Sequence, residues 1–360
     1  MADTPIPPDP ERFLAARPGY VFHFPRDHGA HPGFQTEWWY YTGHLRTDDG
    51  RRFGYQVTFF RRAVRSSRSP DPASPRSAWR LDDLYFAHLA LSDLDGQRFR
   101  FADAMSRAGL GKAGADPERL HVWLDRWHSR KGDRAEAPHH LAALAQDFGL
   151  ELTLTAVKPL TVHGLQGISR KGPSEGQASH YYSQTRLETT GTLLLDGQRW
   201  PVTGQSWMDH EFGSGDLGDS LVGWDWFSVQ LESGEELMLY RLRTTDGQAD
   251  VASSGTWVDR DGRPQHLEAD ALQVEVLDRW TSPVSHAVYP SRWRISIPSK
   301  QAIFVVAPEL ADQELRTTHS TGITYWEGAV RIDGTVKGIP ATGAGYVELT
   351  GYADRYRPRR

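Results

Sequence analysis

The chain has 360 residues, of which 41 are basic and 46 acidic, so its formal net charge is −5. This length predicts two domains, because a single core rarely grows beyond about 250–300 residues, and the composition, 38% hydrophobic and 24% charged, predicts a folded chain. The negative charge gives no electrostatic basis for nucleic-acid binding. No apolar run reaches the roughly 18–20 residues of a membrane span. The lack of cysteine excludes disulfides and cysteine-ligated metals.

Apolar and polar residues alternate along much of the chain, which predicts short β-strands joined by turns. In chain order, strands are predicted at residues 38–45, 53–61, 150–157, 192–195, 200–202, 229–231, 237–242, 255–258, 293–297 and 302–306. Short helices are predicted at residues 101–110 and 135–146. Many short strands at this spacing indicate an all-β sandwich or barrel.

The sequence contains an internal repeat. The segments that match in character are residues 191–197 with 328–334, residues 203–209 with 342–348, and the aromatic residues 38–40 with 224–226. Each half therefore opens on an aromatic strand and closes on a hairpin, and repeats of this length indicate duplicated domains. We predict two tandem antiparallel β-barrels, the first at residues 15–210 and the second at residues 211–354.

Residues 37–41 form an unusual aromatic strand with the sequence Glu-Trp-Trp-Tyr-Tyr. Because side chains alternate along a strand, Trp38 and Tyr40 share one face, and the two rings between and after them share the other. One face must line the barrel. Two interpretations stay open for these rings, namely packing that closes the barrel and direct contact with a ligand.

The densest polar cluster lies at residues 207–211. Trp207, Asp209 and Glu211 are predicted on one face of a strand, with Met208 and His210 on the other. A carboxylate that points into an aromatic barrel is costly when charged, so its pKa rises and its protonated form can act as a general acid. The alternative is a buried Asp209 bonded to backbone groups at the domain junction.

Other catalytic patterns are missing from the sequence. No His-x-His or His-Glu-x-x-His spacing is present, and His28 and His31 lie in a loop-like, proline-containing segment. No nucleophile elbow and no phosphate-binding glycine motif are present either. We therefore predict no metal site and no cofactor.

Several motifs together resemble the AttH/carotenoid 1,2-hydratase (hydroxyneurosporene synthase) family. They are Arg-Asp-His-Gly-x-His-Pro at residues 26–32, Thr-Glu-Trp-Trp-Tyr-Tyr-Thr-Gly at 36–43, Ser-Trp-Met-Asp-His-Glu-Phe-Gly at 206–213, Gly-Trp-Asp-Trp at 223–226, Tyr-Trp-Glu-Gly at 325–328 and Gly-Tyr-Val-Glu-Leu-Thr-Gly-Tyr at 345–352. The resemblance covers nearly the whole chain. It implies two lipocalin-like barrels of the calycin type that hold an apolar ligand.

The resemblance also implies a site. Carotenoid hydratases add water to an isolated double bond at the end of an isoprenoid chain, with a His-x-Trp pair and a Tyr-x-Asp pair. The matching candidates for catalysis here are His180, Tyr182, Trp207 and Asp209, with the two aromatic partners exchanged relative to the family pattern. The candidates for ligand contact are Glu37, Trp38, Tyr40, His210, Glu211, Trp224 and Trp226.

Three functions stay open at this point. The first is a hydratase that adds water to a lipid or isoprenoid by acid catalysis. The second is a non-catalytic lipid carrier, and the third is a cyclase-type pocket that folds a polyene. In each case the expected partner is an apolar small molecule, which could reach the protein from a membrane surface, with no nucleic acid and no transmembrane segment.

The expected location depends on the N-terminus. The first residues, Met-Ala-Asp-Thr-Pro, have neither the basic nor the apolar region of an export signal. Many members of the family that the chain resembles carry such a signal. We expect a periplasmic or secreted protein if a leader has been removed, and a cytoplasmic one otherwise.

Overall fold

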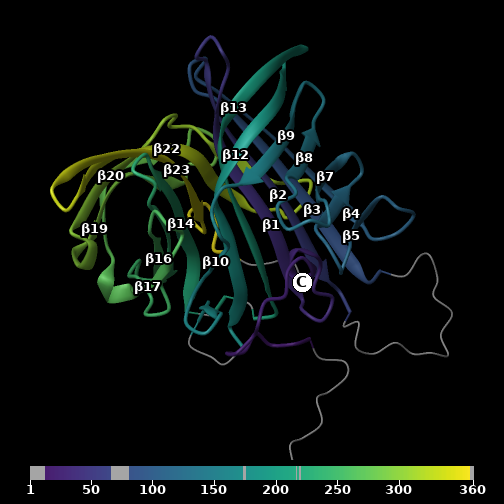
Figure 1. The fold of residues 1–360 in the computed structure, drawn as a ribbon, viewed down its shortest axis with the longest axis horizontal. Coiled ribbons are helices and arrows are strands. Elements are labelled where there is room, and N and C mark those ends of the chain that lie inside the picture. The colour runs from purple at the N-terminus through teal and green to yellow at the C-terminus, as the bar shows by residue number, and fades with distance from the viewer. Residues whose placement is uncertain (1–12, 66–80, 173–175, 216, 219, 357–360) are drawn as a thin grey trace, which may run out of the picture.

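The computed structural model describes residues 13–65, 81–172, 176–215, 217–218 and 220–356. These residues form two antiparallel sheets that lie side by side, as Figure 1 shows. The predicted all-β fold is confirmed, with two barrel-like sheets of which one is nearly closed and the other is a half-barrel. In the described part of the chain, helical structure is limited to three 3-10 turns, η1 (Arg26–His28), η2 (Ala269–Ala271) and η3 (Pro298–Lys300).

The first sheet contains the strands before residue 214. They are β1 (Thr36–Arg46), β2 (Arg52–Ala63), β3 (Asp83–Asp93), β4 (Arg98–Arg107), β5 (Ala113–Ala115), β6 (His121–Leu124), β7 (Trp127–Lys131), β8 (His139–Leu144), β9 (Phe148–Ala156), β10 (Thr161–Val162), β11 (Ser169–Arg170), β12 (Ala178–Leu195) and β13 (Gln198–Gly213). The strand order is β4-β3-β2-β1-β13-β12-β9-β8-β7-β6-β5, and β10 and β11 pair with β12.

The second sheet contains the remaining strands. They are β14 (Leu221–Leu231), β15 (Glu236–Thr244), β16 (Ser254–Val258), β17 (Pro264–Glu268), β18 (Gln273–Thr281), β19 (Val288–Ile297), β20 (Ala302–Pro308), β21 (Glu314–Arg316), β22 (Thr324–Val336) and β23 (Ile339–Thr350). The strand order is β17-β16-β15-β14-β23-β22-β20-β19-β18, and β21 pairs with β22.

The two sheets repeat one topology. In each, the first strand pairs with the last, as β1 with β13 and β14 with β23, and the last two long strands form a hairpin. The strands that correspond are those in which the sequence repeat was found. The first sheet runs through Gly213 and the second begins at Leu221. The domain division at residue 210 stays a prediction.

Both predicted helices are wrong, because their residues belong to strands. Residues 101–110 lie largely in β4, an edge strand that pairs only with β3 and is half-exposed on both faces, so its alternation is weak. Residues 135–146 contain β8, whose buried residues His139, Leu141 and Ala143 alternate with more exposed ones. Alanine favours helices, but pairing with β7 and β9 decides the conformation here.

The interior of each barrel is packed with buried side chains. In the first barrel the inward face of β1 contributes Trp39 and Tyr41, which join one hydrophobic cluster with Met208 of β13. The second barrel has a separate cluster that includes Phe227 and Trp293. No described helix is both long and apolar enough to cross a membrane.

The two barrels pack closely against each other. A Cβ atom added at Gly54 of β2 would lie 2.7 Å from the Cβ of Ala329 and 2.8 Å from the hydroxyl of Tyr346, so only glycine allows this approach of β2 to the second sheet. His44 Nε2 lies 2.8 Å from the carbonyl oxygen of Gly345. These contacts hold the outer face of β1 and β2 against β22 and β23.

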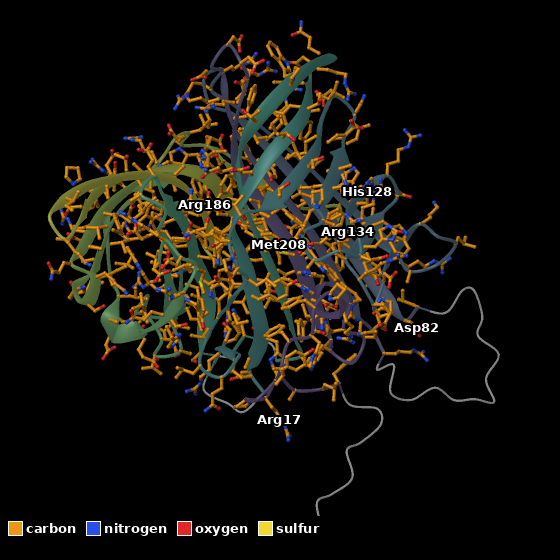
Figure 2. The ribbon with its side chains drawn as sticks, viewed as in Figure 1. Arg17, Asp82, His128, Arg134, Arg186 and Met208 are labelled. Carbon is orange, nitrogen blue, oxygen red and sulfur yellow. The ribbon has the colours of Figure 1, made fainter. Side chains whose placement is uncertain are left out.

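Glu236 of β15 links the barrels through two ion pairs. Its side chain is fully buried, and its oxygens lie 2.8 Å from Lys158 Nζ and 2.6 Å from Arg186 Nε. Arg186 is labelled near the middle of the molecule in Figure 2. Because both cations belong to the first half of the chain, this carboxylate neutralises charges that the packing of the two barrels would otherwise bury.

Replacing Glu236 with alanine is expected to lower the free energy of unfolding by about 2–3 kcal/mol. Removing one partner of a fully buried pair costs about 3–5 kcal/mol, and here both cations keep some contact with water. Urea denaturation measures the change, with Glu275→Ala on exposed β18 as the control. A loss below about 0.5 kcal/mol, the scale of an ordinary surface substitution, would contradict this account of the interface.

Candidate functional site

A cavity of about 230 Å³ lies between the two barrels. Strands β1, β2, β3, β12 and β13 of the first sheet and β14, β15, β22 and β23 of the second contribute its walls. Its apolar surface comes mainly from large side chains, among them Trp38, Tyr40, Phe60, Phe86, Trp224 and Trp226. Four carboxyl groups also line it, those of Asp209, Glu211, Glu327 and Glu348.

The cavity's position corrects the expectation that the aromatic rings and Asp209 point into a barrel. Trp38 and Tyr40 do share a face, as predicted, but this is the outer face of β1, which the second sheet covers. The inward rings, Trp39 and Tyr41, are packed in the first barrel's core. Trp38 and Trp224, which line the cavity, are half-buried.

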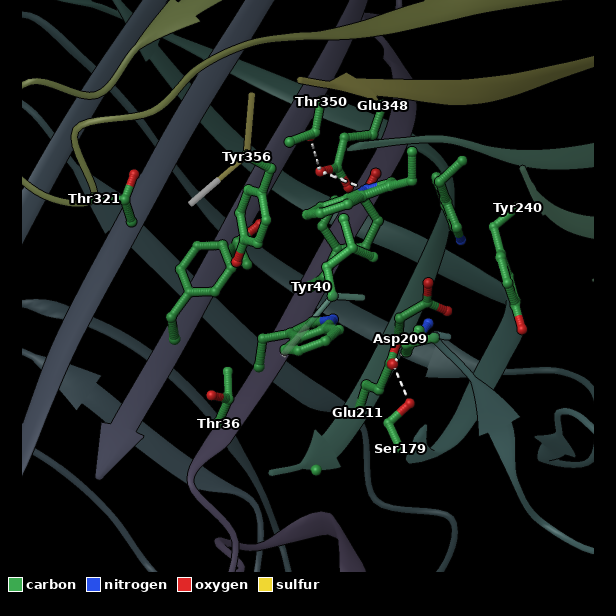
Figure 3. Close-up of a pocket in the computed structure, with 18 of the residues that line it drawn as sticks. Thr36, Tyr40, Ser179, Asp209, Glu211, Tyr240, Thr321, Glu348, Thr350 and Tyr356 are labelled. Carbon is green, nitrogen blue, oxygen red and sulfur yellow. Dashed lines mark hydrogen bonds and ion pairs between the residues drawn. The ribbon is translucent and has the colours of Figure 1, made fainter. Parts of the chain in front are cut away.

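Strand β13 presents its acids to the cavity by simple alternation. Asp209 and Glu211 line it, whereas Met208 and His210 face the first barrel's interior. Figure 3 shows Asp209, Glu211 and Ser179 at the lower right of the cavity, with Glu348 and Thr350 of β23 at the top. Asp209, Glu211 and Glu348 thus come from the final strand of each sheet, and Glu327 comes from the neighbouring β22.

Asp209 is 4% exposed and accepts three hydrogen bonds. Tyr181 Oη donates to Oδ2 at 2.6 Å, Trp207 Nε1 donates to Oδ1 at 2.6 Å, and Ser183 Oγ donates to Oδ1. Burial raises the pKa of Asp209 to about 7, although the three donors act in the opposite direction. The group therefore changes its protonation near neutral pH, which an ordinary aspartate does not do.

The second sheet supplies a matching set of polar groups. Tyr40 Oη donates to Glu327 Oε1 at 2.7 Å, and Trp224 Nε1 donates to Glu348 Oε1 at 3.1 Å. Trp226 Nε1 donates to Tyr181 Oη at 3.1 Å. The hydrogen bonds from Tyr40 and from Trp226 both cross from one sheet to the other, so each wall contributes polar groups that contact the opposite wall.

Lys171 places one positive charge at the cavity wall. Its Nζ lies 2.8 Å from Glu211 Oε1 and 4.5 Å from the ring centroid of Tyr240. Burial alone would lower the pKa of Lys171, but the charge of Glu211 raises it above the usual value. The lysine is therefore charged at neutral pH and forms an ion pair with Glu211, whereas Asp209 has no direct ion pair among the described residues.

His180 and Tyr182 do not reach the cavity. They lie on the face of β12 opposite to Tyr181, and the ring of His180 stacks on Tyr20 with centroids 4.3 Å apart. Tyr182 Oη lies 2.7 Å from His28 Nδ1 inside the first half of the molecule. At the interface between the two sheets, the structure brings Asp209 and Trp207 together with Trp38, Tyr40, Trp224 and Trp226. His180 and Tyr182 are not part of this group.

Glu37 and His210 also lie behind the cavity, in a buried network. Glu37 Oε1 lies 2.7 Å from His31 Nδ1 and 2.9 Å from His210 Nε2, and Arg61 Nε donates to Oε2 at 3.0 Å. The ligand atoms of the two histidines and Glu37 lie within 4.8 Å of one another, a spacing that metals accept. Both histidines, however, contact the Glu37 carboxylate directly, and Arg61 already pairs with it. These residues therefore form an ion-pair and hydrogen-bond network.

Sequence reasoning missed several residues of the cavity. Tyr181 lies between the two chosen residues of β12, and pairing with β13 shows that Tyr181 and Ser183 are opposite Glu211 and Asp209. Glu327 and Glu348 stood in the motifs that carry the family resemblance. Residue 348 also matched residue 209 in the repeat, which was the available signal for a second acid.

Comparisons with known proteins agree with this architecture. The sequence profile of a family described as AttH-like matches residues 15–352. The solved structure of an AttH protein from Nitrosomonas europaea is 35% identical to this chain and superposes with a TM-score of 0.84, over 94% of this chain and 100% of that one.

Two further relatives carry names that describe water chemistry. Kievitone hydratase from Nectria haematococca is 13% identical, with a TM-score of 0.71 over 96% of this chain and 98% of that one, a likeness that shows the fold alone. Dehydratase asqC from Emericella nidulans is 26% identical over 211 residues, which are 55% of this chain and 57% of that protein. The alignment with this curated relative therefore spans little more than half its length.

Proposed function

The chain belongs to the AttH-like family, and from that premise we propose that it binds an apolar lipid or isoprenoid in the cavity between its barrels and adds water to an isolated carbon–carbon double bond. The observation that carries this proposal is a buried carboxyl group, Asp209, that titrates near neutral pH within an aromatic cavity. The names of two relatives, a hydratase and a dehydratase, support water chemistry in this fold.

In the proposed mechanism, protonated Asp209 gives its proton to one carbon of the double bond. The neighbouring carbon becomes a tertiary cation, and water adds to it. Aromatic faces stabilise a cation by about 0.5–2 kcal/mol each, and Trp38, Trp224 and Trp226 line the cavity where the cation forms. Trp207 and Tyr181 hold the Asp209 carboxyl in position through their hydrogen bonds.

The size of the cavity limits the substrate. An engineered cavity of about 150 Å³ holds benzene, so 230 Å³ has room for roughly nine non-hydrogen atoms on the same scale. A long isoprenoid would therefore enter with one end only, and its remaining length would lie outside the cavity. This geometry suits reaction at a terminal double bond.

Squalene, whose two ends are trisubstituted alkenes, provides a test of the proposed function. The protein is expected to convert it in ¹⁸O-labelled water to an alcohol that carries the label, because the added oxygen comes from water. Gas chromatography with mass spectrometry detects the product, and heat-denatured protein is the control. Tight binding without any labelled product would contradict hydration and favour the carrier.

A further inference from the structure

The two walls of the cavity carry equivalent acids. Asp209 lies on β13, opposite Tyr40 of β1, and Glu348 lies on β23, opposite Trp226 of β14. Because β1 corresponds to β14 and β13 to β23 in the repeated topology, these two acids occupy matching positions in the two halves. Tyr40 and Trp226 meet edge to face at 5.1 Å, so the matching faces contact each other.

The surroundings of the two acids also match. Each accepts an indole N–H, from Trp207 in the first half and from Trp224 in the second. Each also accepts a hydrogen bond from a hydroxyl group of its own sheet. For Glu348 the donor is Thr350 Oγ1, which lies 2.9 Å from Glu348 Oε1. Burial raises the pKa of Glu348 to about 7, the same value as for Asp209.

One difference separates the two walls. The residue opposite Asp209 on β12 is Ser183, whereas the residue opposite Glu348 on β22 is Glu327. Glu327 is 1% exposed and lines the cavity. Its Oε1 accepts the hydrogen bond from Tyr40.

Two carboxyl groups directly opposite each other on neighbouring strands have Cβ atoms about 4.5–5.5 Å apart, and a buried pair cannot readily carry two negative charges. Glu327 and Glu348 therefore hold at least one proton in total near neutral pH. The pKa of Glu327 lies well above its usual value because of burial and then the charge of Glu348. With one proton bound, the pair can still accept another.

We propose that Glu327 and Glu348 form a second proton-transfer site, which accepts the proton that water loses while Asp209 protonates the substrate on the other wall. This inference rests on the proposed hydration. As the water oxygen bonds to the cationic carbon, its O–H bond breaks and that proton passes to the Glu348 carboxylate. Each turnover moves one proton from Asp209 to the pair, and exchange with solvent water restores both groups.

The proposed site at Glu327 and Glu348 also implies where the new hydroxyl group of the product lies. The hydroxyl group of the product forms next to Glu327, whose Oε1 accepts the hydrogen bond from Tyr40. In the reverse reaction, a protonated pair would give its proton to the hydroxyl as water leaves. One arrangement of residues therefore serves both hydration and dehydration of a tertiary alcohol.

A carbodiimide tests whether the pair holds a proton in the absence of substrate. Diisopropylcarbodiimide is small and apolar and reacts with protonated carboxyl groups: its nitrogen takes the acid proton, and the carboxylate oxygen adds to its central carbon. At neutral pH, peptide mass spectrometry is expected to find the adduct on Glu327 or Glu348 and on Asp209. The exposed Glu151 of β9, which pairs with Arg199, should remain free, and an unlabelled pair would overturn the inference.

The variant Glu348→Gln tests the role in the reaction, because glutamine keeps an oxygen to accept the Trp224 N–H but cannot take a proton. Squalene hydration is expected to fall at least about 100-fold with binding unchanged, whereas Glu151→Gln retains the wild-type rate. Wild-type turnover by Glu348→Gln would overturn the inference and leave the proposed function standing. A wild-type protein that leaves squalene unchanged would count against the proposed function, while the labelling still decides whether the pair holds a proton.

Discussion

Replacing Asp209 with asparagine is expected to lower the hydration rate at least about 100-fold, since loss of a general acid typically costs a factor of 10²–10⁴. Asparagine cannot donate the proton, but its carbonyl oxygen still accepts the hydrogen bonds that Trp207 and Ser183 make to Oδ1. Ligand affinity, measured by quenching of the cavity tryptophans, should stay within a few-fold of wild type. Retained turnover would exclude Asp209 as the acid.

The pH dependence separates this chemical role from a folding defect. The wild-type reaction needs protonated Asp209, so its rate should fall as the pH rises through about 7. The folded pKa lies above the unfolded value of about 3.8, so the native state binds this proton more tightly, and the associated stability is lost as the pH rises through the folded pKa. Above pH 7, Asp209→Asn should therefore unfold no more easily than wild type, which thermal unfolding measures.

Replacing Glu37 with alanine is expected to lower the free energy of unfolding by about 3–5 kcal/mol, the cost of leaving a buried charge without its partner. Glu37 is fully buried, and its carboxylate contacts His31, His210 and Arg61. Arg61, which is 1% exposed, would lose one of its two salt bridges and keep the one to Asp83. Urea denaturation at neutral pH measures the change.

The sign of the pH effect is part of this prediction. Burial alone would raise the pKa of Glu37, but the charges of His31 and Arg61 and the hydrogen bonds of the two histidines hold it well below its usual range. The stabilisation is therefore fully present above the unfolded pKa of about 4.5 and is lost as the pH falls through the lower folded value. The exposed variant Glu151→Ala is the control. A change below about 0.5 kcal/mol for Glu37→Ala would contradict a structural role for the network.

Alternation along single strands was predictable because it depends only on neighbouring residues. It separated Trp38 and Tyr40 from the rings beside them, and Asp209 and Glu211 from Met208 and His210, as the structure has them. The internal repeat similarly indicated two sheets of one topology. These features need no knowledge of which strands pair or how the barrels meet.

The position of the cavity was not predictable in this way. Tyr40 is buried and Trp38 half-buried because a second sheet covers the outside of the first, and no local pattern distinguishes an inner face from a covered outer face. The placement of Tyr181, rather than His180 and Tyr182, at the cavity has a related cause. Which face of β12 joins Asp209 depends on its register with β13, which contains a shift between Gln184 and Leu187.

Mass spectrometry of the organic extract from protein purified out of its native host tests the central claim most directly. If the cavity between the barrels binds an apolar molecule and adds water to it, the extract should contain that molecule together with a species heavier by one water. An extract of fatty acyl lipids without any such pair would contradict hydration and identify the protein as a carrier.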